Sequence, residues 1–114
     1  MTIQFTEGQA AQGELLFEYI DALPAGAVEI MSDAEHHIVG HSETGHHHVM
    51  SIGRVRHFRD TRNPMVTYLL INEPDELRHL REFDTHRSLA FRPGVVRVDH
   101  QREGEMDEWR QATD

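Results

Sequence analysis

The 114-residue sequence contains neither cysteine nor lysine, and each absence removes a class of chemistry. Without cysteine there is no disulfide, thiolate metal ligand or cysteine nucleophile, so a bound metal ion would be held by nitrogen and oxygen ligands. Without lysine, Schiff-base chemistry and the lysine of a phosphate-binding loop are excluded. All eleven basic residues are arginine.

Long hydrophobic runs are also missing. The longest apolar stretch, around Val66–Ile71, is far too short to cross a bilayer. The N-terminal segment has neither a basic region nor an apolar run, which predicts no secretory signal and a cytoplasmic location. A chain of this length fits a single domain over residues 1–114 with one modest core.

Positive charge is scarce. Twenty acidic residues outnumber eleven arginines, and the formal net charge is −9 with histidines neutral. Because phosphate neutralisation supplies most of the affinity for nucleic acids, neither nucleic acid nor an anionic membrane is expected as a partner. Protonation of all ten histidines would move the charge from −9 to +1, so solubility and self-association should respond to mild acid.

The apolar pattern consists of short runs between turn residues, which favours strands over helices. Strands are expected at Glu14–Ile20, Ala27–Met31, His36–His41, His46–Ile52, Arg54–Arg59, Met65–Ile71, Ser88–Phe91 and Val95–Gln101. Six or more short strands predict a mostly β fold, a small barrel or sandwich, with a cupin-like jelly roll among the candidates.

Two local features complete the expected fold. One short helix is expected around residues 74–83, where Pro74 starts the segment and Leu77 and Leu80 have helical spacing; a loop is the alternative. The turn Arg92-Pro93-Gly94 suggests that the two strands flanking it form a hairpin.

The most informative feature is the histidine-rich centre. Side chains alternate along a strand, so His46, His48 and Met50 share one face. Two residues of spacing separate the two histidines by about 6–7 Å at the backbone, which lets both rings converge on one ion. This spacing predicts a site for a divalent metal ion such as zinc, iron, nickel or manganese. The alternative is a pair of ordinary hydrogen-bonded histidines.

Further ligands must come from elsewhere in the chain. The candidates are His41, Glu43, His79, Asp84, His86 and His100, and the predicted ligand set is His41, His46, His48 and His86. His100 shares a face with Val96 and Val98, so it is expected to be a hydrogen-bonded core histidine. Solvent exposure is expected for the other histidines, namely His36, His37, His57 and His79.

The spacing from Gly40 to His46-x-His48 resembles the opening of the first cupin motif. In cupins a glutamate follows three or four residues later, whereas this chain has Ile52 and Gly53 there. The resemblance implies a metal held by the two histidines, with a further ligand supplied from another part of the chain.

The chain also resembles an uncharacterised family of small bacterial and phage proteins. The matching segments are Gln12-Gly13-Glu14-Leu15-Leu16, Leu23-Pro24-Ala25-Gly26-Ala27, Thr44-Gly45-His46-His47-His48, Pro93-Gly94 and Val96-Arg97-Val98-Asp99-His100-Gln101-Arg102-Glu103. The family carries an H-E-E-H motif where this chain has Phe83-Asp84-Thr85-His86. The resemblance implies importance for His46, His48 and His86, with His79, His41 or Asp84 in place of the missing histidine. It implies no particular reaction.

Two functions stay open at this point. The first is a non-catalytic binding or interaction module, in which histidines hold a structural ion or respond to pH. The second is a cupin-like metal-dependent enzyme acting on a small polar molecule, with the ion polarising a carbonyl or activating water or dioxygen. The module is favoured because no acid/base partner is clearly marked. An exposed strand edge would also suit a homodimer.

Overall fold

A computed structural model of the chain describes residues 2–12, 14–32, 36–40, 48–79 and 88–100, and within these ranges every regular element is a strand. The strands are β1 Thr2–Phe5, β2 Gln9–Gln12, β3 Leu15–Ile20, β4 Val28–Glu29, β5 His36–Gly40, β6 His48–Ser51, β7 Val55–Arg59, β8 Val66–Ile71, β9 Asp75–His79, β10 Ser88–Phe91 and β11 Gly94–His100. The expected mostly β fold is therefore confirmed.

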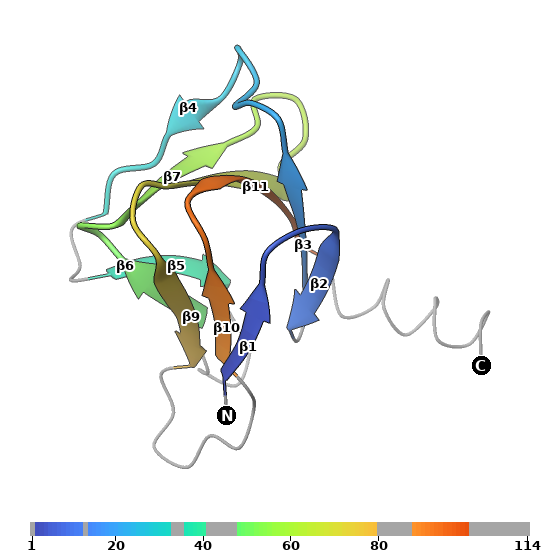
Figure 1. Cartoon of the computed structure of the whole chain (residues 1–114). Helices are drawn as coiled ribbons and strands as arrows, with labels where there is room; N and C mark the ends of the chain where they lie inside the picture. The colour runs from blue at the N-terminus through green and yellow to red at the C-terminus, as the bar shows by residue number, and fades with distance from the viewer. Residues whose placement is uncertain (1, 13, 33–35, 41–47, 80–87, 101–114) are drawn as a thin grey trace.

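The strands form two sheets, which Figure 1 shows with β4 and β7 at the top and the β1, β9 and β10 group below. One sheet has five strands in the order β1-β10-β9-β6-β5, and the other has six in the order β2-β3-β11-β8-β7-β4. All of the pairings are antiparallel except that of β1 with β10, in which Thr2 lies opposite Ser88.

A hydrophobic core joins the two sheets. Alternate residues of each strand turn toward this core, as the period of two in a strand requires. Its buried members are Phe5, Leu15, Phe17, Val39, Met50, Val55, Leu69, Ile71, Leu77, Leu89, Phe91, Val96 and Val98. Full burial of one such side chain contributes about 1.5–3 kcal/mol, so packing of the two inner faces is the main stabilising term for this arrangement.

A second, smaller cluster covers part of the outer face of the six-stranded sheet. Phe58, Val66 and Tyr68 form it, and Leu23 and Ala27 of the segment between β3 and β4 pack against it. Tyr68 donates a 2.7 Å hydrogen bond to Asp60 Oδ2, so its polar end is paired although its ring is buried. This cluster explains why adjacent residues of β7 and β8 are buried on both faces.

The expected helix around residues 74–83 is wrong over the part that the structure describes. Asp75–His79 forms strand β9, which pairs with β10 on one side and β6 on the other. Leu77 is fully buried opposite Leu89, and this burial between two strands outweighs the weak helical spacing of the segment. Residues 80–83 lie outside the described ranges.

The expected hairpin around Arg92-Pro93-Gly94 is also corrected. The two flanking strands belong to different sheets, because β10 pairs with β1 and β9 whereas β11 pairs with β3 and β8. The turn is a corner between the sheets, and Gly94 adopts a φ of 149° there. A Cβ at this position would lie 2.9 Å from Arg92 Nη1 and 3.3 Å from Tyr19 Cε1, so only glycine fits without rearrangement.

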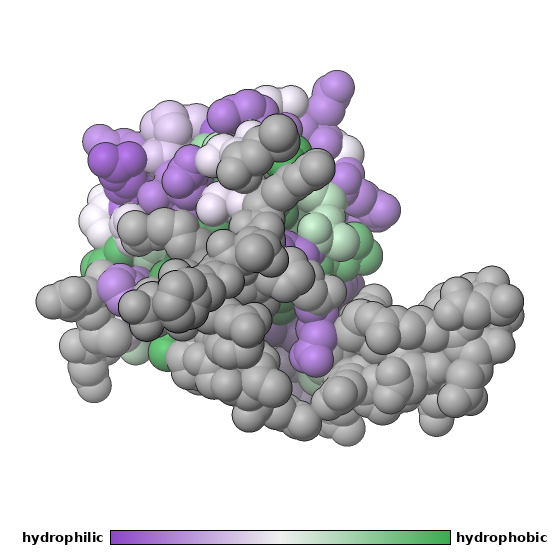
Figure 2. Space-filling model, turned by 90° about the horizontal axis from the view of Figure 1, so that it is seen from below, coloured by the Kyte–Doolittle hydropathy of each residue, from purple (hydrophilic) through white to green (hydrophobic). Residues whose placement is uncertain are grey.

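The surface of the described residues is mixed. In the view from below, hydrophilic side chains cover much of the described surface, and smaller hydrophobic patches lie between them (Figure 2). In the described part of the chain, no helix has the length and apolar character needed to span a membrane.

Candidate functional site

The predicted metal ligands are only partly covered by the structure. His41, His46 and His86 lie outside the described residues, as do the alternative ligands Glu43 and Asp84. His48 is the first residue of β6. Metal binding by the predicted set therefore stays a prediction. Of the four predicted ligands, His48 alone belongs to a strand of the described residues.

His48 lies directly beside another histidine position in the five-stranded sheet. β6 and β9 are antiparallel, and His48 is the register partner of His79. Directly opposite residues of such a pair have Cβ atoms roughly 4.5–5.5 Å apart, a separation that two ligands of one ion can have. Sequence patterns do not predict this pairing, because the segment around His79 is expected to be a helix or a loop rather than a strand.

Strand β11, whose last residue is His100, ends at the same end of the sandwich as β6 and β9. His48 lies opposite Gly40 of β5, next to an irregularity in the pairing. A Cβ on Gly40 would come 2.7 Å from Leu15 Cδ1, so the two sheets approach closely at this point. Leu15 is in turn the register partner of His100, the last residue of β11. The register thus gathers positions 48, 79 and 100 at one end.

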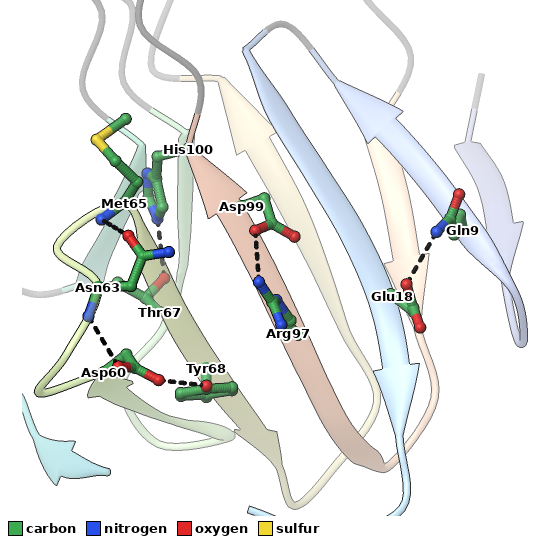
Figure 3. A network of polar contacts seen from close by, with 10 residues as sticks. All are labelled: Gln9, Glu18, Asp60, Asn63, Met65, Thr67, Tyr68, Arg97, Asp99 and His100. Carbon is green, nitrogen blue, oxygen red and sulfur yellow. Dashed lines mark hydrogen bonds and ion pairs between the residues drawn. The ribbon is translucent and has the colours of Figure 1, made fainter. Parts of the chain in front are cut away.

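His100 behaves as expected from its alternation with Val96 and Val98, which are fully buried. Its Nε2 shares a 2.9 Å hydrogen bond with Thr67 Oγ1 of the neighbouring strand β8 (Figure 3). The same view shows Arg97 paired with Asp99 further along β11, at 3.1 Å. The predicted hydrogen bond and inward face of His100 are confirmed, but the side chain is half-buried at the end of β11 rather than in the core.

Two other histidines, His37 and His57, are buried rather than exposed as expected. His37 and His57 were expected to be solvated, but their exposed fractions are only 6% and 5%. Each alternates with a core valine, His37 with Val39 on β5 and His57 with Val55 on β7. The period of two could have identified both as inward positions, but the surrounding charged and histidine residues obscured this signal.

The two buried rings meet between the two sheets. Their centroids are 5.8 Å apart, with an interplanar angle of 73°. His37 Nε2 lies 2.7 Å from the Val55 carbonyl oxygen. Because a carbonyl can only accept, Nε2 carries the hydrogen, and in the neutral ring Nδ1 then carries a lone pair. His37 Nδ1 and His57 Nε2 are both buried without a hydrogen-bond partner in the structure.

Burial also sets the protonation state of His57. Desolvation, followed by the proximity of His37 and His100, lowers the pKa of His57 from 6.5 to about 4. The ring is therefore neutral at physiological pH and has one nitrogen lone pair. His57 therefore contributes a neutral imidazole to this interior pair.

Among the described residues, no group of three or more His, Asp or Glu side chains is arranged to hold a metal ion. An open depression of about 510 Å³ lies elsewhere, lined by Gln4, Ser51, Arg54, Pro74, Asp75, Glu76, Ala90 and Phe91. Asp75 Oδ2 accepts a 2.7 Å hydrogen bond from the Ser51 amide, and Oδ1 accepts a 3.2 Å bond from the Ser51 hydroxyl. The Asp75 carboxylate thus ties the end of β6 to the start of β9.

The fold and its histidines define a two-sheet β domain with several histidine positions on or beside its inner faces. This chain belongs to the family described as a domain of unknown function, DUF8820, whose family model matches residues 11–101. The match confirms membership of an uncharacterised family and leaves the motif residues and the cupin resemblance as expectations. No curated protein and no solved structure matches the chain.

Proposed function

We propose that this chain is a non-catalytic β module that binds one divalent metal ion at the end of the sandwich where β6 begins and β9 ends. The observation that carries the proposal is the register pairing of His48 with His79. Antiparallel pairing places these two positions at a spacing compatible with a shared ion. The predicted partners His41, His46 and His86 would complete the ligand set.

The pairing also supports a replacement for the histidine that is missing from the family motif. The sequence leaves His79, His41 and Asp84 as alternatives for that ligand. Strand β9 favours His79, because its position is already next to His48 in the sheet. Neutral imidazoles suit zinc, iron or nickel, and manganese would require more carboxylate ligands.

The residues that line the described depression favour a binding role over catalysis. Among the residues that the structure describes, the lining of the 510 Å³ depression contains no histidine. An enzyme of the cupin-like kind would need an open coordination position that faces a substrate pocket. The described lining of this depression supplies no imidazole ligand for such a position, so a structural or interaction role is favoured.

The test is the metal content of tagless protein purified without a metal-affinity column, measured by mass spectrometry. We expect near-stoichiometric metal in the wild type and its loss in the double variant His48→Ala/His79→Ala. His36→Ala is the matched control, because His36 lies on β5 opposite Ser51 and its backbone carbonyl, which the substitution keeps, accepts a hydrogen bond from the Ser32 hydroxyl. It should retain the metal.

Two outcomes would contradict the proposal. Metal-free wild-type protein whose melting temperature does not change with added zinc, nickel, manganese or ferrous iron would exclude the site. Full metal content in the double variant, with a native circular dichroism spectrum, would exclude His48 and His79 as its ligands.

A further inference from the structure

A second group of donor atoms lies in the core between the two sheets. It consists of His37 on β5, His57 on β7 and Met50 on β6. All three side chains are at least nine-tenths buried, with exposed fractions of 6%, 5% and 0% respectively. Both imidazoles hold a buried nitrogen for which the structure shows no hydrogen-bond partner. A buried polar atom without a partner costs about 1–3 kcal/mol, so such atoms in a native core point to an additional bound species.

The His37 ring is oriented as a metal ligand is. Metal-binding histidines usually donate their second ring N–H to a carboxylate or a backbone carbonyl, which fixes the tautomer and the ring direction. His37 Nε2 donates in this way to the Val55 carbonyl, at 2.7 Å. The other ring nitrogen, Nδ1, is therefore fixed in direction and buried.

The separation of the two rings fits a shared ion. Metal–imidazole bonds of roughly 2.0 Å place the ring centroids of two histidines on one ion roughly 5–6 Å apart. The observed centroid separation of His37 and His57 is 5.8 Å.

Met50 adds a sulfur donor on the same face. It is the register partner of His37 and belongs to the core cluster that fills the space between the sheets. Thioether sulfur is a soft ligand that selects monovalent copper over zinc, magnesium or calcium. The expectation of nitrogen and oxygen ligands follows from the absence of cysteine and does not take account of methionine thioethers.

The charge balance of the set also favours a monovalent ion. Imidazole and thioether groups are neutral when they bind a metal ion, and the described core cluster that contains Met50 is apolar. The cost of burying an ion rises steeply with its charge, so an uncompensated divalent ion is much less favourable here than a monovalent one. We propose that His37, His57 and Met50 form a buried site that takes one cuprous ion, closed to solvent and suited to holding copper rather than to catalysis.

The experiment supplies cuprous ion to the full chain as its bicinchoninate complex, without oxygen and with ascorbate present. We expect the wild type to withdraw copper from the chelator. Met50→Leu keeps the volume of the core and should raise the copper dissociation constant about tenfold or more, since even loss of a residue that only orients a ligand costs 10–100-fold. His36→Ala should bind copper as the wild type does.

Copper K-edge absorption of the loaded protein identifies the donors, because other histidines of the chain also have affinity for copper. We expect sulfur in the first coordination shell of the wild type and of His48→Ala/His79→Ala, and its loss in Met50→Leu. A first shell of nitrogen or oxygen alone in the wild type would overturn the proposal, as would equal affinity in Met50→Leu. The double variant separates this site from the divalent one, because it should lose the divalent ion and keep the copper.

Discussion

The core of this domain contains a few buried polar side chains among its apolar ones. Most of its core is made of aliphatic and aromatic side chains, and the exceptions are Gln12, His37 and His57. The two histidines are stacked edge to face, with a pKa shift on one of them. Their effect on stability should therefore depend on pH.

The first prediction concerns acid sensitivity of the metal-free protein. Folding lowers the pKa of His57 from 6.5 to about 4, so in this interval the unfolded chain takes up a proton that the folded chain does not. Stability is therefore complete above pH 6.5 and falls as the pH drops toward 4. For this one group the loss between pH 7 and pH 5 is about 2 kcal/mol. Urea unfolding at both pH values measures it.

His57→Leu should remove this part of the pH dependence, because the new side chain does not titrate. His36→Ala should preserve it. If His57→Leu shows the same difference between pH 7 and pH 5 as the wild type, other groups are responsible for the acid sensitivity.

The second prediction concerns the close approach of β5 and β3. A Cβ on Gly40 would come 2.7 Å from Leu15 Cδ1 and 3.2 Å from its Cγ, and Leu15 is buried and cannot easily move aside. Gly40→Ala should lower the free energy of unfolding by about 1–3 kcal/mol through overpacking. Gly53→Ala is the control, because no heavy atom lies within 4 Å of a Cβ there. Equal stability of the two variants in urea would show that Leu15 adapts without cost.

At the level of strands, the sequence predicted most elements because alternation and turn residues are local signals. The strands at residues 36–40, 66–71 and 88–91 lie where they were expected. β9 was missed because Asp75–His79 has few apolar residues, and only its two neighbours make it a strand. The corner at Gly94 was taken for a hairpin because a turn motif does not reveal which sheet the next strand joins.

The candidate site was less predictable than the fold. The spacing of His46 and His48 indicates a ligand pair, but register pairings such as that of His48 with His79 depend on contacts between segments far apart in the sequence. The pair of His37 and His57 joins two different sheets, so no local pattern could have brought these residues together. Long-range packing, rather than motif, determines both arrangements.

The third prediction concerns how β1 is attached. Tyr19 Oη accepts a 2.9 Å hydrogen bond from the Arg92 amide and lies 3.2 Å from the Phe5 carbonyl oxygen, so one hydroxyl links β3, the end of β1 and the corner after β10. Tyr19→Phe should cost about 1 kcal/mol, which corresponds to roughly fivefold faster amide exchange in β1.

Tyr68→Phe is the matched control for this prediction. It also removes a tyrosine hydroxyl bond, that to Asp60, but on the outer face of β8. If β1 opens separately from the rest of the sheet, Tyr68→Phe leaves exchange in Thr2–Phe5 unchanged. Equal acceleration of β1 exchange in both variants would show that β1 opens only with the whole domain.

At the scale of the molecule, the net charge controls association. It is −9 with neutral histidines and rises toward zero as they gain protons. We therefore predict that light scattering increases between pH 8 and pH 5 at low salt, as mutual repulsion is lost. Arg62→Glu at an exposed position changes the charge from −9 to −11 and should shift the onset to lower pH. An unchanged onset would exclude net charge as the cause.

The parallel pairing of β1 with β10 has a consequence for biosynthesis. Thr2 and its partner Ser88 are separated by 86 positions (88 minus 2), and Tyr19 and Arg92 both contact the end of β1. At a translation rate of about 5–20 residues per second, β1 emerges from the ribosome several seconds before its partner strand does. A nascent chain therefore carries an unpaired strand with Ile3 and Phe5 until almost the whole sheet has been made, and exposed apolar segments of this kind are what chaperones bind during synthesis.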